Sequence, residues 1–595
     1  MKKNYNNDIE NVDLENELDD FKSLKSKKNK KNNKQPVFPV VLATFIGTII
    51  FVAIALIGYK YWNSMPQNQT VEYHEYFADD RQFVSVEDTY HKLETPVITQ
   101  EGSVYVPFEF VKTYVDSYIF YDKDTSTITV TNTTNVIKMK TDDLTYYVND
   151  DTLSLNLPII ESNDTAYLPI DIIENLYDVS IIYNEDNQML SLNYDDLPST
   201  KAALSSNTKL RYDSEKNSNI VDRLAKDETV EVYGEYDSFT KVKTSSGLLG
   251  YIPTKDLGTR EDIESVQKDI YSPKNLLDND FTLLWDQIYN YAANNLPSKQ
   301  SLPTGVDVLS PTWFSFDENK LDGTIVSLAD NGYVDAIHEQ GGQVWPILTD
   351  NFNSNVSSSI LRSAENRQNV IKQILALCTL YELDGINIDF EAVLPEDSEY
   401  FIQFLRELYP YMNKSGLILS VDTFVPSEWS MYYNRTAIGE TVDYVVVMAY
   451  DEHTSASSTT GPVASLDFVD SAMANTLEEV PKNQVVMGMP FYTRIWKVHE
   501  NGSFTISNYG MDSAIEFFER NNATFVDDPE TGYTYAFFEE VENGVNYKFE
   551  AWLESSETIE KKLEIYEKYD VAGVALWSRG FEQDNTFETI HNVVN

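Results

Sequence analysis

Eight short apolar runs recur through the second half of the chain, and a segment with helical patterning separates each run from the next. Runs of this length are typical of buried strands, and strands that alternate with helices form parallel sheets with helices on their faces. Eight such units predict an α/β fold, a (β/α)8 TIM barrel, which we place at residues 272–595. The runs are Phe281–Trp285, Val306–Leu309, Gln343–Leu348, Gly385–Phe390, Leu417–Val421, Tyr444–Met448, Val485–Met489 and Gly573–Leu576.

The interval between the seventh and eighth runs is longer than the others. It contains strand-like pieces of its own at Tyr533–Phe538 and Asn546–Trp552. We therefore expect a small α+β insertion between strands 7 and 8 of the barrel.

Near the amino terminus, residues 37–59 form an uncharged and mostly apolar run. As a helix it would be about 35 Å long, enough to cross a bilayer core of about 30 Å. Seven lysines lie between residues 22 and 34, so the positive-inside rule puts a tail of residues 1–36 in the cytoplasm and the rest of the chain outside. A cleavable signal peptide is the alternative, but the run is long and no clear small-x-small site follows it. We expect a single-pass membrane anchor.

A motif repeats at an offset of 62 residues between the anchor and the barrel. Tyr105-Val106-Pro107 recurs as Tyr167-Leu168-Pro169, and each copy precedes a helix-like segment and a β-hairpin pattern. We place this α+β repeat module at residues 91–196, after a linker at 60–90. It resembles the copper amine oxidase N-terminal module of exported proteins, although no histidine cluster is present to bind copper. The resemblance implies a spacer or wall-binding role.

A small all-β region is predicted at residues 208–258, after a polar linker that begins at Asp196 and ends at Asn207. Its five short strand-like runs follow the order of bacterial SH3-like domains, which this region resembles. Such domains bind cell-wall peptide or support their neighbour, and the sequence does not separate the two roles. The runs are Leu210-Arg211, Ile220-Val221, Val230–Gly234, Lys241-Val242 and Gly250–Ile252.

Composition excludes several classes of function. The 45 Lys+Arg against 95 Asp+Glu give a net charge of -50, which argues against nucleic-acid binding. The single cysteine, Cys378, lies in an apolar helical pattern and is expected in the core. The six histidines are scattered, and the chain has no zinc-protease, serine-hydrolase or P-loop motif. We expect neither a metal nor another cofactor.

The segment Asp384–Glu391 carries the clearest chemical signal. Its apolar residues alternate with Asn387, Asp389 and Glu391, so in a barrel strand these three polar side chains point into the interior. Burying them without a purpose would cost several kcal/mol, although a satisfied polar cluster is the structural alternative. Glu391 comes last, at the rim where barrel active sites lie. Asp389 is roughly 6.6 Å away along the strand and should hold Glu391 protonated, as a general acid requires.

This segment resembles the Asp-x-x-Asp-x-Asp-x-Glu signature of glycoside hydrolase family 18, the chitinase-like barrels. Three further elements are similar in the same order: Met448-Ala449-Tyr450-Asp451, Gly488–Arg494 and Trp577 at the end of strand eight. The resemblance covers residues 275–595.

The resemblance implies substrate-assisted, retaining catalysis, in which the acetamido oxygen of the substrate attacks the anomeric carbon. Glu391 would act as acid and then as base, Asp389 would orient the acetamido N–H, and Tyr450 would bind the acetamido oxygen. These three are the expected catalytic residues. The expected substrate-binding residues are Asn387, Asp451, Met448, Tyr492, Arg494, Trp577 and Trp285.

Two positions depart from the family pattern. Asn387 stands where the signature often has Asp, and it cannot share a proton with its neighbour. Our hypothesis is that activity survives with a shifted acid limb of the pH profile. Strand three, Gln343–Ile347, lacks the usual Ser-x-Gly-Gly, which favours a cell-wall-directed branch over a chitinase-type cleft.

Other aromatic residues near predicted strand ends fit either a sugar cleft or the core. His453 follows the Tyr-Asp pair, and a structural hydrogen bond fits it better than a catalytic role. The aromatic residues are Trp313, Trp345, Trp429 and Trp496.

Together these features predict a membrane-anchored glycoside hydrolase that cleaves β-1,4 bonds next to N-acetylglucosamine, with its barrel outside the cell. Peptidoglycan is the favoured substrate because the anchor and the wall-type modules place the barrel beside the cell wall, and chitin is the other substrate. A non-catalytic, lectin-like receptor for the same glycans is the alternative function. A structural scaffold for wall proteins is a third.

Overall fold

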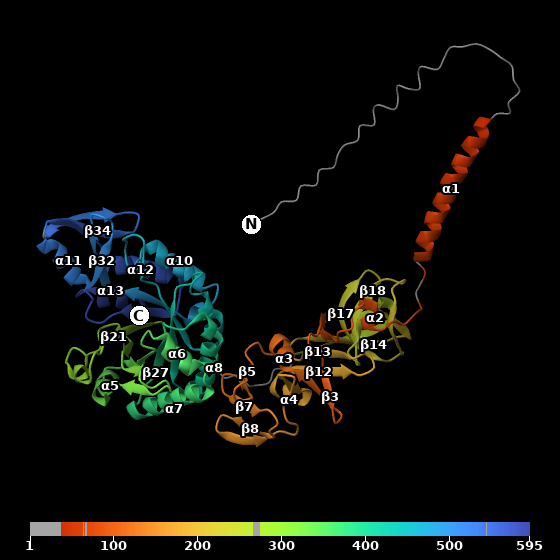
Figure 1. Cartoon of the computed structure of the whole chain (residues 1–595), viewed down its shortest axis with the longest axis horizontal. Coiled ribbons are helices and arrows are strands. Elements are labelled where there is room, and N and C mark those ends of the chain that lie inside the picture. The colour runs from red at the N-terminus through yellow and green to blue at the C-terminus, as the bar shows by residue number, and fades with distance from the viewer. Residues whose placement is uncertain (1–36, 64, 66–67, 266–273, 543, 595) are drawn as a thin grey trace, which may run out of the picture. The chain divides into compact units, whose positions relative to one another are not determined.

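The computed structural model describes residues 37–63, 65, 68–265, 274–542 and 544–594 (Figure 1). The predicted tail at 1–36 and the predicted first residue of the barrel, 272, lie outside these ranges. The chain divides into two compact units. The first contains residues up to Glu72 together with 202–242 and 249–259, and the second contains the rest.

The second half of the chain contains a closed ring of eight parallel strands. Each strand pairs in parallel with the next, and the last pairs with both the first and the seventh. The eight runs identified in the sequence are these strands. They are β21 (Phe281–Asp286), β22 (Val308–Pro311), β25 (Gln343–Val344) with β26 (Ile347–Thr349), β27 (Gly385–Asp389), β28 (Ile418–Phe424), β29 (Tyr444–Met448), β30 (Val485–Pro490) and β36 (Gly573–Trp577).

Strand three is split in two, a feature that the sequence analysis missed. β25 pairs with β22, and β26 pairs with β27, so the ring closes through both pieces. The break falls at Trp345-Pro346, because proline has no N–H to donate to the ladder. A short antiparallel pair, β23 (Phe314–Phe316) and β24 (Ile325–Ser327), extends the sheet beside β26.

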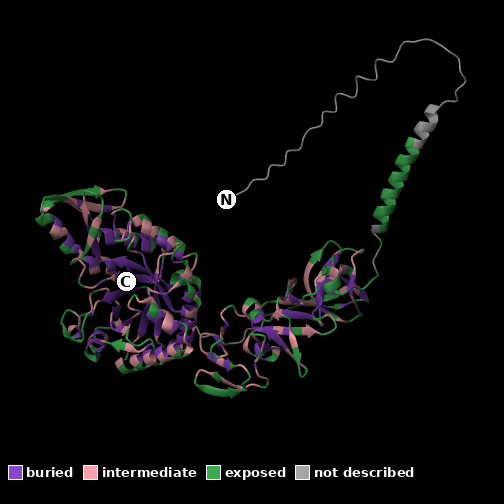
Figure 2. Ribbon diagram, viewed as in Figure 1, coloured by how far each residue is buried: buried purple, intermediate pink, exposed green. Residues whose placement is uncertain are grey.

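Helices cover the outer face of the ring, and Figure 1 shows α5, α7 and α8 outside the strands. Figure 2 shows that the strands they cover are buried. Cys378 is buried in this layer, as predicted. The helices are α5 (Asn331–His338), α6 (Ser354–Leu361), α7 (Ala364–Tyr381), α8 (Ser398–Lys414), α9 (Arg435–Thr441), α10 (Leu466–Thr476), α12 (Ser556–Tyr569) and α13 (Thr586–Val594).

The interior of the ring has its own apolar cluster, which includes Trp345 and Trp285. The Trp345 ring lies 5.3 Å from that of Phe281 and is stacked 6.0 Å from that of Tyr444. Trp313, Trp345 and Trp496 are 0–1 % exposed, so these three belong to the core and not to a sugar cleft.

A five-stranded antiparallel sheet and one helix, α11, lie between β30 and the barrel helix α12 in the sequence. The two strand-like pieces identified there fall within β34 and β35. The order in the sheet is β32-β31-β35-β34-β33. The elements are β31 (Tyr492–His499), β32 (Phe504–Gly510), α11 (Met511–Arg520), β33 (Thr524–Asp528), β34 (Tyr533–Glu542) and β35 (Val545–Leu553).

The two copies of the repeated motif lie side by side. β4 (Ser103–Pro107) pairs antiparallel with β11 (Thr165–Pro169), and Val106 faces Leu168. Each strand runs directly into a short helix, α3 (Phe108–Tyr114) or α4 (Ile170–Leu176). The rest of the module consists of β3 (Ile98–Gln100), β5 (Phe120–Asp122), β6 (Thr127–Thr131), β7 (Val136–Lys140), β8 (Thr145–Val148), β9 (Asp151–Ser154), β10 (Ile160–Ser162), β12 (Val179–Asn184) and β13 (Met189–Tyr194).

The linker predicted at 60–90 is wrong over its second half. It contains α2 (Tyr73–Phe77), β1 (Phe83–Val86) and the start of β2 (Thr89–Lys92). β1 pairs in parallel with β13, with Phe83 opposite Met189, so the module begins before residue 91. Four residues with one buried apolar pair are too short to give a periodic signal in the sequence.

The linker predicted at 196–207 is also wrong, because it contains β14 (Ser199–Leu204). Ala202 and Leu204 are buried, and β14 lies between β17 and β20 in a seven-stranded sheet. All five runs predicted at 208–258 fall within strands of this sheet, whose likeness to an SH3 domain stays a prediction. The strands are β15 (Thr208–Arg211), β16 (Ile220–Leu224), β17 (Thr229–Tyr236), β18 (Phe239–Thr244), β19 (Leu249–Pro253) and β20 (Leu257–Ile263).

The apolar run near the amino terminus forms α1 (Val37–Asn63). Its segment Phe45–Trp62 has a mean hydropathy of 1.7 and is exposed along its length (Figure 2). By length and composition this helix could cross a membrane, and a signal sequence would have the same properties.

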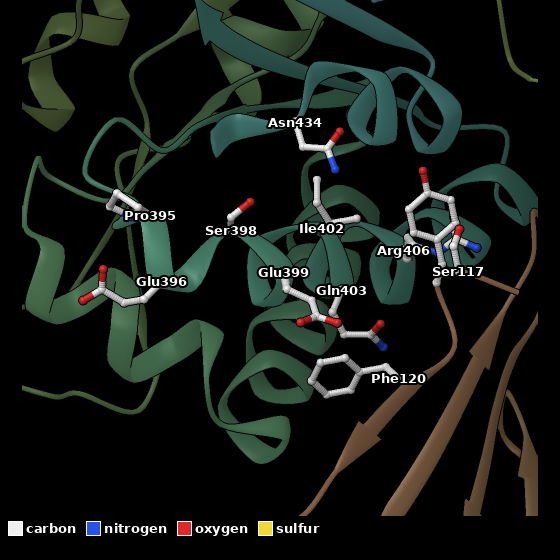
Figure 3. Close-up of a pocket in the computed structure, with 11 residues that line it drawn as sticks. Ser117, Phe120, Pro395, Glu396, Ser398, Glu399, Ile402, Gln403, Arg406 and Asn434 are labelled. Carbon is white, nitrogen blue, oxygen red and sulfur yellow. The ribbon is translucent and has the colours of Figure 1, made fainter. Parts of the chain in front are cut away.

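The repeat module contacts the barrel at α8. Arg406 donates from Nε and Nη2 to the hydroxyl and carbonyl oxygens of Thr131, at 2.9 and 3.0 Å. A pocket of about 530 Å³ lies at this contact (Figure 3). None of the predicted site residues lines it. The lining residues are Ser117, Tyr118, Phe120, Pro395, Glu396, Ser398, Glu399, Ile402, Gln403, Arg406 and Asn434.

Candidate active site

Strand β27 has the two faces that its alternation predicts. Ile386 and Ile388 are fully buried in the cluster beneath the helices. Asn387 and Asp389 are 0 % and 8 % exposed on the other face, and Glu391 follows, half-buried, just beyond the end of the strand. The strand therefore delivers two carboxyl groups to the rim at the carboxyl end of the barrel.

These two carboxyl groups share one electrostatic environment. Burial raises the pKa of Asp389, and the charge of Asp350 raises it further. Burial also raises the pKa of Glu391, and Asp389, Asp350 and Asp451 add to this effect. A carboxyl group in this setting keeps its proton to higher pH than an exposed one, which is the condition for a general acid at neutral pH.

The Oδ1 atom of Asp389 is buried and has no hydrogen-bond partner among the described residues. An unpaired buried acceptor costs about 1–3 kcal/mol, so such an atom is exceptional in a well-packed strand. A ligand that brings an N–H or O–H group to this atom would remove that cost.

Asn387 is held in a buried hydrogen-bond network. Its Oδ1 accepts from Trp285 Nε1–H at 3.0 Å, and its Nδ2 donates to Asp422 Oδ1 at 2.8 Å and to Ser420 Oγ at 3.0 Å. Asn387 and Trp285 are 0 % and 1 % exposed. We predicted that these two residues contact the substrate directly. Their burial instead places them beneath the candidate site, where they can support it.

Asp422, which the sequence analysis missed, belongs to the same network. It lies on the inward face of β28, two residues after Ser420, and it is buried. Burial raises its pKa, as do the charges of Asp389 and Glu391. The alternation of Ser420 and Asp422 within an apolar strand is the signal that could have identified it.

Replacing Asn387 with Asp is expected to move the acid limb of the pH–rate profile to higher pH. The new carboxyl group would lie beside Asp422 and close to Asp389, and like charges disfavour ionisation. The group that must be ionised for activity would then keep its proton to a higher pH. The measurement is kcat/KM against pH for both proteins, and superimposable profiles would remove the hypothesis.

Aromatic side chains form one side of the site. The ring of Trp285 lies edge-on to Trp577 at 5.7 Å and to Tyr450 at 6.5 Å. Trp577 and Tyr450 are partly exposed above the buried Trp285, and Met448 is 8 % exposed at the end of β29. The pKa of Tyr450 is raised, chiefly by burial. Its hydroxyl group therefore keeps its hydrogen and can donate a hydrogen bond.

Asp451, Tyr492 and Arg494 form a second polar group at the rim. Arg494 Nη2 donates to Asp451 Oδ1 at 2.8 Å, and the Tyr492 hydroxyl donates to the same oxygen. The side chain of Asp451 is 47 % exposed, whereas that of Arg494 is 6 % exposed. The arrangement leaves a carboxylate facing outward with its orientation fixed from below.

The remaining predicted residues take separate positions. Nδ1 of His453 lies 3.2 Å from the carbonyl oxygen of Pro462, in agreement with a structural role. Trp429 is 58 % exposed after β28, with its ring 4.9 Å from that of Phe424. No group of three or more metal-ligating side chains was found among the described residues.

Comparison with known proteins relates two parts of the chain to families. Residues 337–582 match the model of glycosyl hydrolases family 18, and residues 85–192 match that of the copper amine oxidase N-terminal domain. The barrel resembles an uncharacterized glycosylase of Bacillus subtilis, YvbX, with 24 % identity over 315 residues, which are 50 % of this chain and 89 % of the relative.

A cortical fragment-lytic enzyme of Bacillus anthracis is 28 % identical over 313 residues, which are 48 % of this chain and 69 % of that enzyme. Among solved structures, the Bacillus cereus spore cortex-lytic enzyme SleL gives a TM-score of 0.47 at 21 % identity. That match covers 57 % of this chain and 78 % of the other.

Proposed function

Since its barrel carries a glycosyl hydrolase family 18 domain, the chain is a glycosidase, and we propose that it hydrolyses β-1,4 bonds next to N-acetylglucosamine in peptidoglycan. One observation carries the proposal: Asp389 Oδ1 is buried without a hydrogen-bond partner among the described residues, close to Glu391, whose pKa is raised by burial and by the charge of Asp389. In such a substrate, the acetamido N–H group would donate a hydrogen bond to this oxygen.

The proposed reaction uses the substrate's own N-acetyl group. Glu391 gives its proton to the glycosidic oxygen as the bond from that oxygen to the anomeric carbon breaks. The acetamido oxygen attacks the same carbon and forms a cyclic oxazolinium ion. Glu391, now a carboxylate, takes a proton from water, and the resulting hydroxide opens the ring at the anomeric carbon. Two inversions leave the configuration of the product unchanged.

Other residues would assist by position. Asp389 would hold the acetamido N–H and balance the positive charge of the oxazolinium ion. Tyr450 would donate its hydroxyl hydrogen to the acetamido oxygen, and its raised pKa keeps that hydrogen in place. Trp577 would present its partly exposed ring to the apolar face of the sugar, and Asp451 with Arg494 would bind sugar hydroxyl groups.

Peptidoglycan is preferred over chitin for two reasons. Cortical fragment-lytic enzymes are among the relatives of the barrel by their printed names. Helix α1 would also hold the barrel beside the cell's own wall if it anchors the chain, with the lysine-rich tail in the cytoplasm and the barrel outside.

A product analysis tests this function. The full-length chain in mild detergent, and its Glu391→Gln variant, are incubated with purified peptidoglycan and with chitin oligosaccharides, and new reducing ends are identified by mass spectrometry. We expect N-acetylglucosamine ends from peptidoglycan with the wild-type chain only. Binding without products would favour the lectin-like receptor, and products from chitin alone would contradict the proposed substrate.

A further inference from the structure

Asp350 follows directly after β26 and is fully buried at the carboxyl end of strand three. Neither the sequence analysis nor the family pattern assigns it a role. Its two carboxylate oxygens accept four hydrogen bonds, and two of the donors belong to the segment that carries the proposed acid.

The bonds to that segment are made by backbone groups. Glu391 N–H donates to Asp350 Oδ1 at 3.3 Å, and Ala392 N–H donates to Asp350 Oδ2 at 2.9 Å. Two successive peptide groups just past the end of β27 are therefore held by one carboxylate. They set the direction in which the Glu391 side chain leaves the strand.

The other two bonds hold Asp350 itself in place. Phe352 N–H donates to Oδ1 at 3.1 Å, and the Ser357 hydroxyl, from the buried side of α6, donates to Oδ2 at 2.7 Å. Asn351 and Phe352 both have a φ of +56°, a backbone conformation that is unusual for a bulky residue such as phenylalanine. The turn is kept in this form by Asp350, which supports a functional reason for it.

All four donors to Asp350 are neutral, and none of the ion pairs in the described part of the chain includes it. By contrast, the buried Asp286 at the end of β21 is paired with both Lys299 and Arg579. The negative charge of Asp350 is therefore not cancelled by a neighbouring cation. It acts on the carboxyl groups of Asp389 and Glu391 through a buried environment.

We propose that Asp350 is a positioning residue of the active site: it fixes the peptide groups of Glu391 and Ala392 and places an uncancelled negative charge beside the two catalytic carboxyl groups. This inference rests on the proposed function of Glu391 as the acid. It also explains how strand three contributes to the site without the Ser-x-Gly-Gly of the family.

The charge has a defined effect on pH dependence. The carboxyl groups near Glu391 are those of Asp389 at the end of β27, Asp350 after β26 and Asp451 after β29, and Asp422, Tyr433 and Tyr450 also interact with it. Arg494, a nearby cation, forms an ion pair with Asp451. Removing the Asp350 charge lowers the pKa of Glu391. Glu391 then loses its proton at a lower pH, and the alkaline limb of the pH–rate profile shifts to lower pH.

The test compares Asp350→Asn with Asp350→Glu in the full-length chain. Asp350→Asn removes the charge, and we expect the alkaline limb of the plot of kcat/KM against pH to shift by about one unit to lower pH. Asp350→Glu keeps the charge but displaces the oxygens, and we expect kcat to fall about tenfold or more with the limb unmoved. Asp322→Asn is the matched control, because the carboxylate of Asp322 accepts hydrogen bonds from Thr324 in an exposed turn, and its profile should match the wild type.

The outcomes separate this inference from the proposed function. An Asp350→Asn profile that superimposes on the wild type, with Glu391→Gln inactive, overturns the role of Asp350 alone. An active Glu391→Gln variant overturns the proposed function. If Asp350→Asn does not fold, Asp350→Glu decides, because a kcat within about twofold of the wild type shows that the oxygens of Asp350 do not position the acid.

Discussion

The Glu391→Gln variant is expected to lose a factor of about 10²–10⁴ in kcat, because glutamine cannot give a proton to the leaving oxygen or take one from water. KM should change little, since the amide has nearly the same shape and the sugar contacts come from other residues. The measurement is the initial rate of release of reducing ends from peptidoglycan under saturating substrate.

A matched control separates this loss from a general effect of the substitution. Glu396 lies five residues further along the chain and is exposed, and its ion-pair contact with Arg362 is long, at 3.9 Å. Glu396→Gln should keep the wild-type rate within about twofold. A Glu391→Gln variant with comparable activity would mean that another group supplies the proton.

The second large effect concerns stability. Lys562 and Glu554 are 0 % exposed, and Lys562 Nζ lies 2.7 Å from both carboxylate oxygens of Glu554. Lys562→Met would leave that carboxyl group buried without its cation. We expect a loss of about 3–5 kcal/mol in the free energy of unfolding, seen as a lower thermal midpoint for the barrel.

The neighbouring Lys561 offers the control. It pairs with Glu557, whose side chain is 70 % exposed, and Lys561→Met should cost no more than about 1 kcal/mol. The double variant Lys562→Met/Glu554→Leu should recover part of the loss, because it removes both buried charges. Equal midpoints for the two single variants would show that the buried pair is not a major source of stability.

This buried pair also connects the inserted sheet to the barrel. The Tyr533 hydroxyl, from β34, donates to Glu554 Oε2 at 2.9 Å, and Lys562 belongs to α12. Glu554 N–H donates to the hydroxyl oxygen of Thr493 at 2.8 Å, next to the proposed sugar-binding Arg494. A weakened pair would therefore also be expected to loosen one wall of the site.

The sequence located the barrel strands well because each is an apolar run between helical segments. The same alternation predicted that Asp389, at the end of β27, and Glu391, two residues beyond it, point the same way, and the effect of Asp389 on the pKa of Glu391 agrees with that prediction. Periodicity is a local property of the sequence, and it predicts a strand correctly where the strand is long enough to show it.

What was missed depends on contacts between distant parts of the chain. Asp350 lies beyond the end of its strand, and only the folded barrel brings it to the peptide groups after β27. Asn387 and Trp285 are 102 positions apart, and their hydrogen bond places both beneath the site. The two predicted linkers failed because β1 and β14 are short strands stabilised by their partners in the sheet.

The stereochemistry of the first product tests the central claim most directly. Soluble glycan strands from peptidoglycan are digested in an NMR tube, and the anomeric protons of the new reducing end are followed before mutarotation. The account predicts that the β-anomer appears first, because the acetamido group and water each invert the carbon once. First appearance of the α-anomer would contradict substrate-assisted catalysis by Asp389 and Glu391.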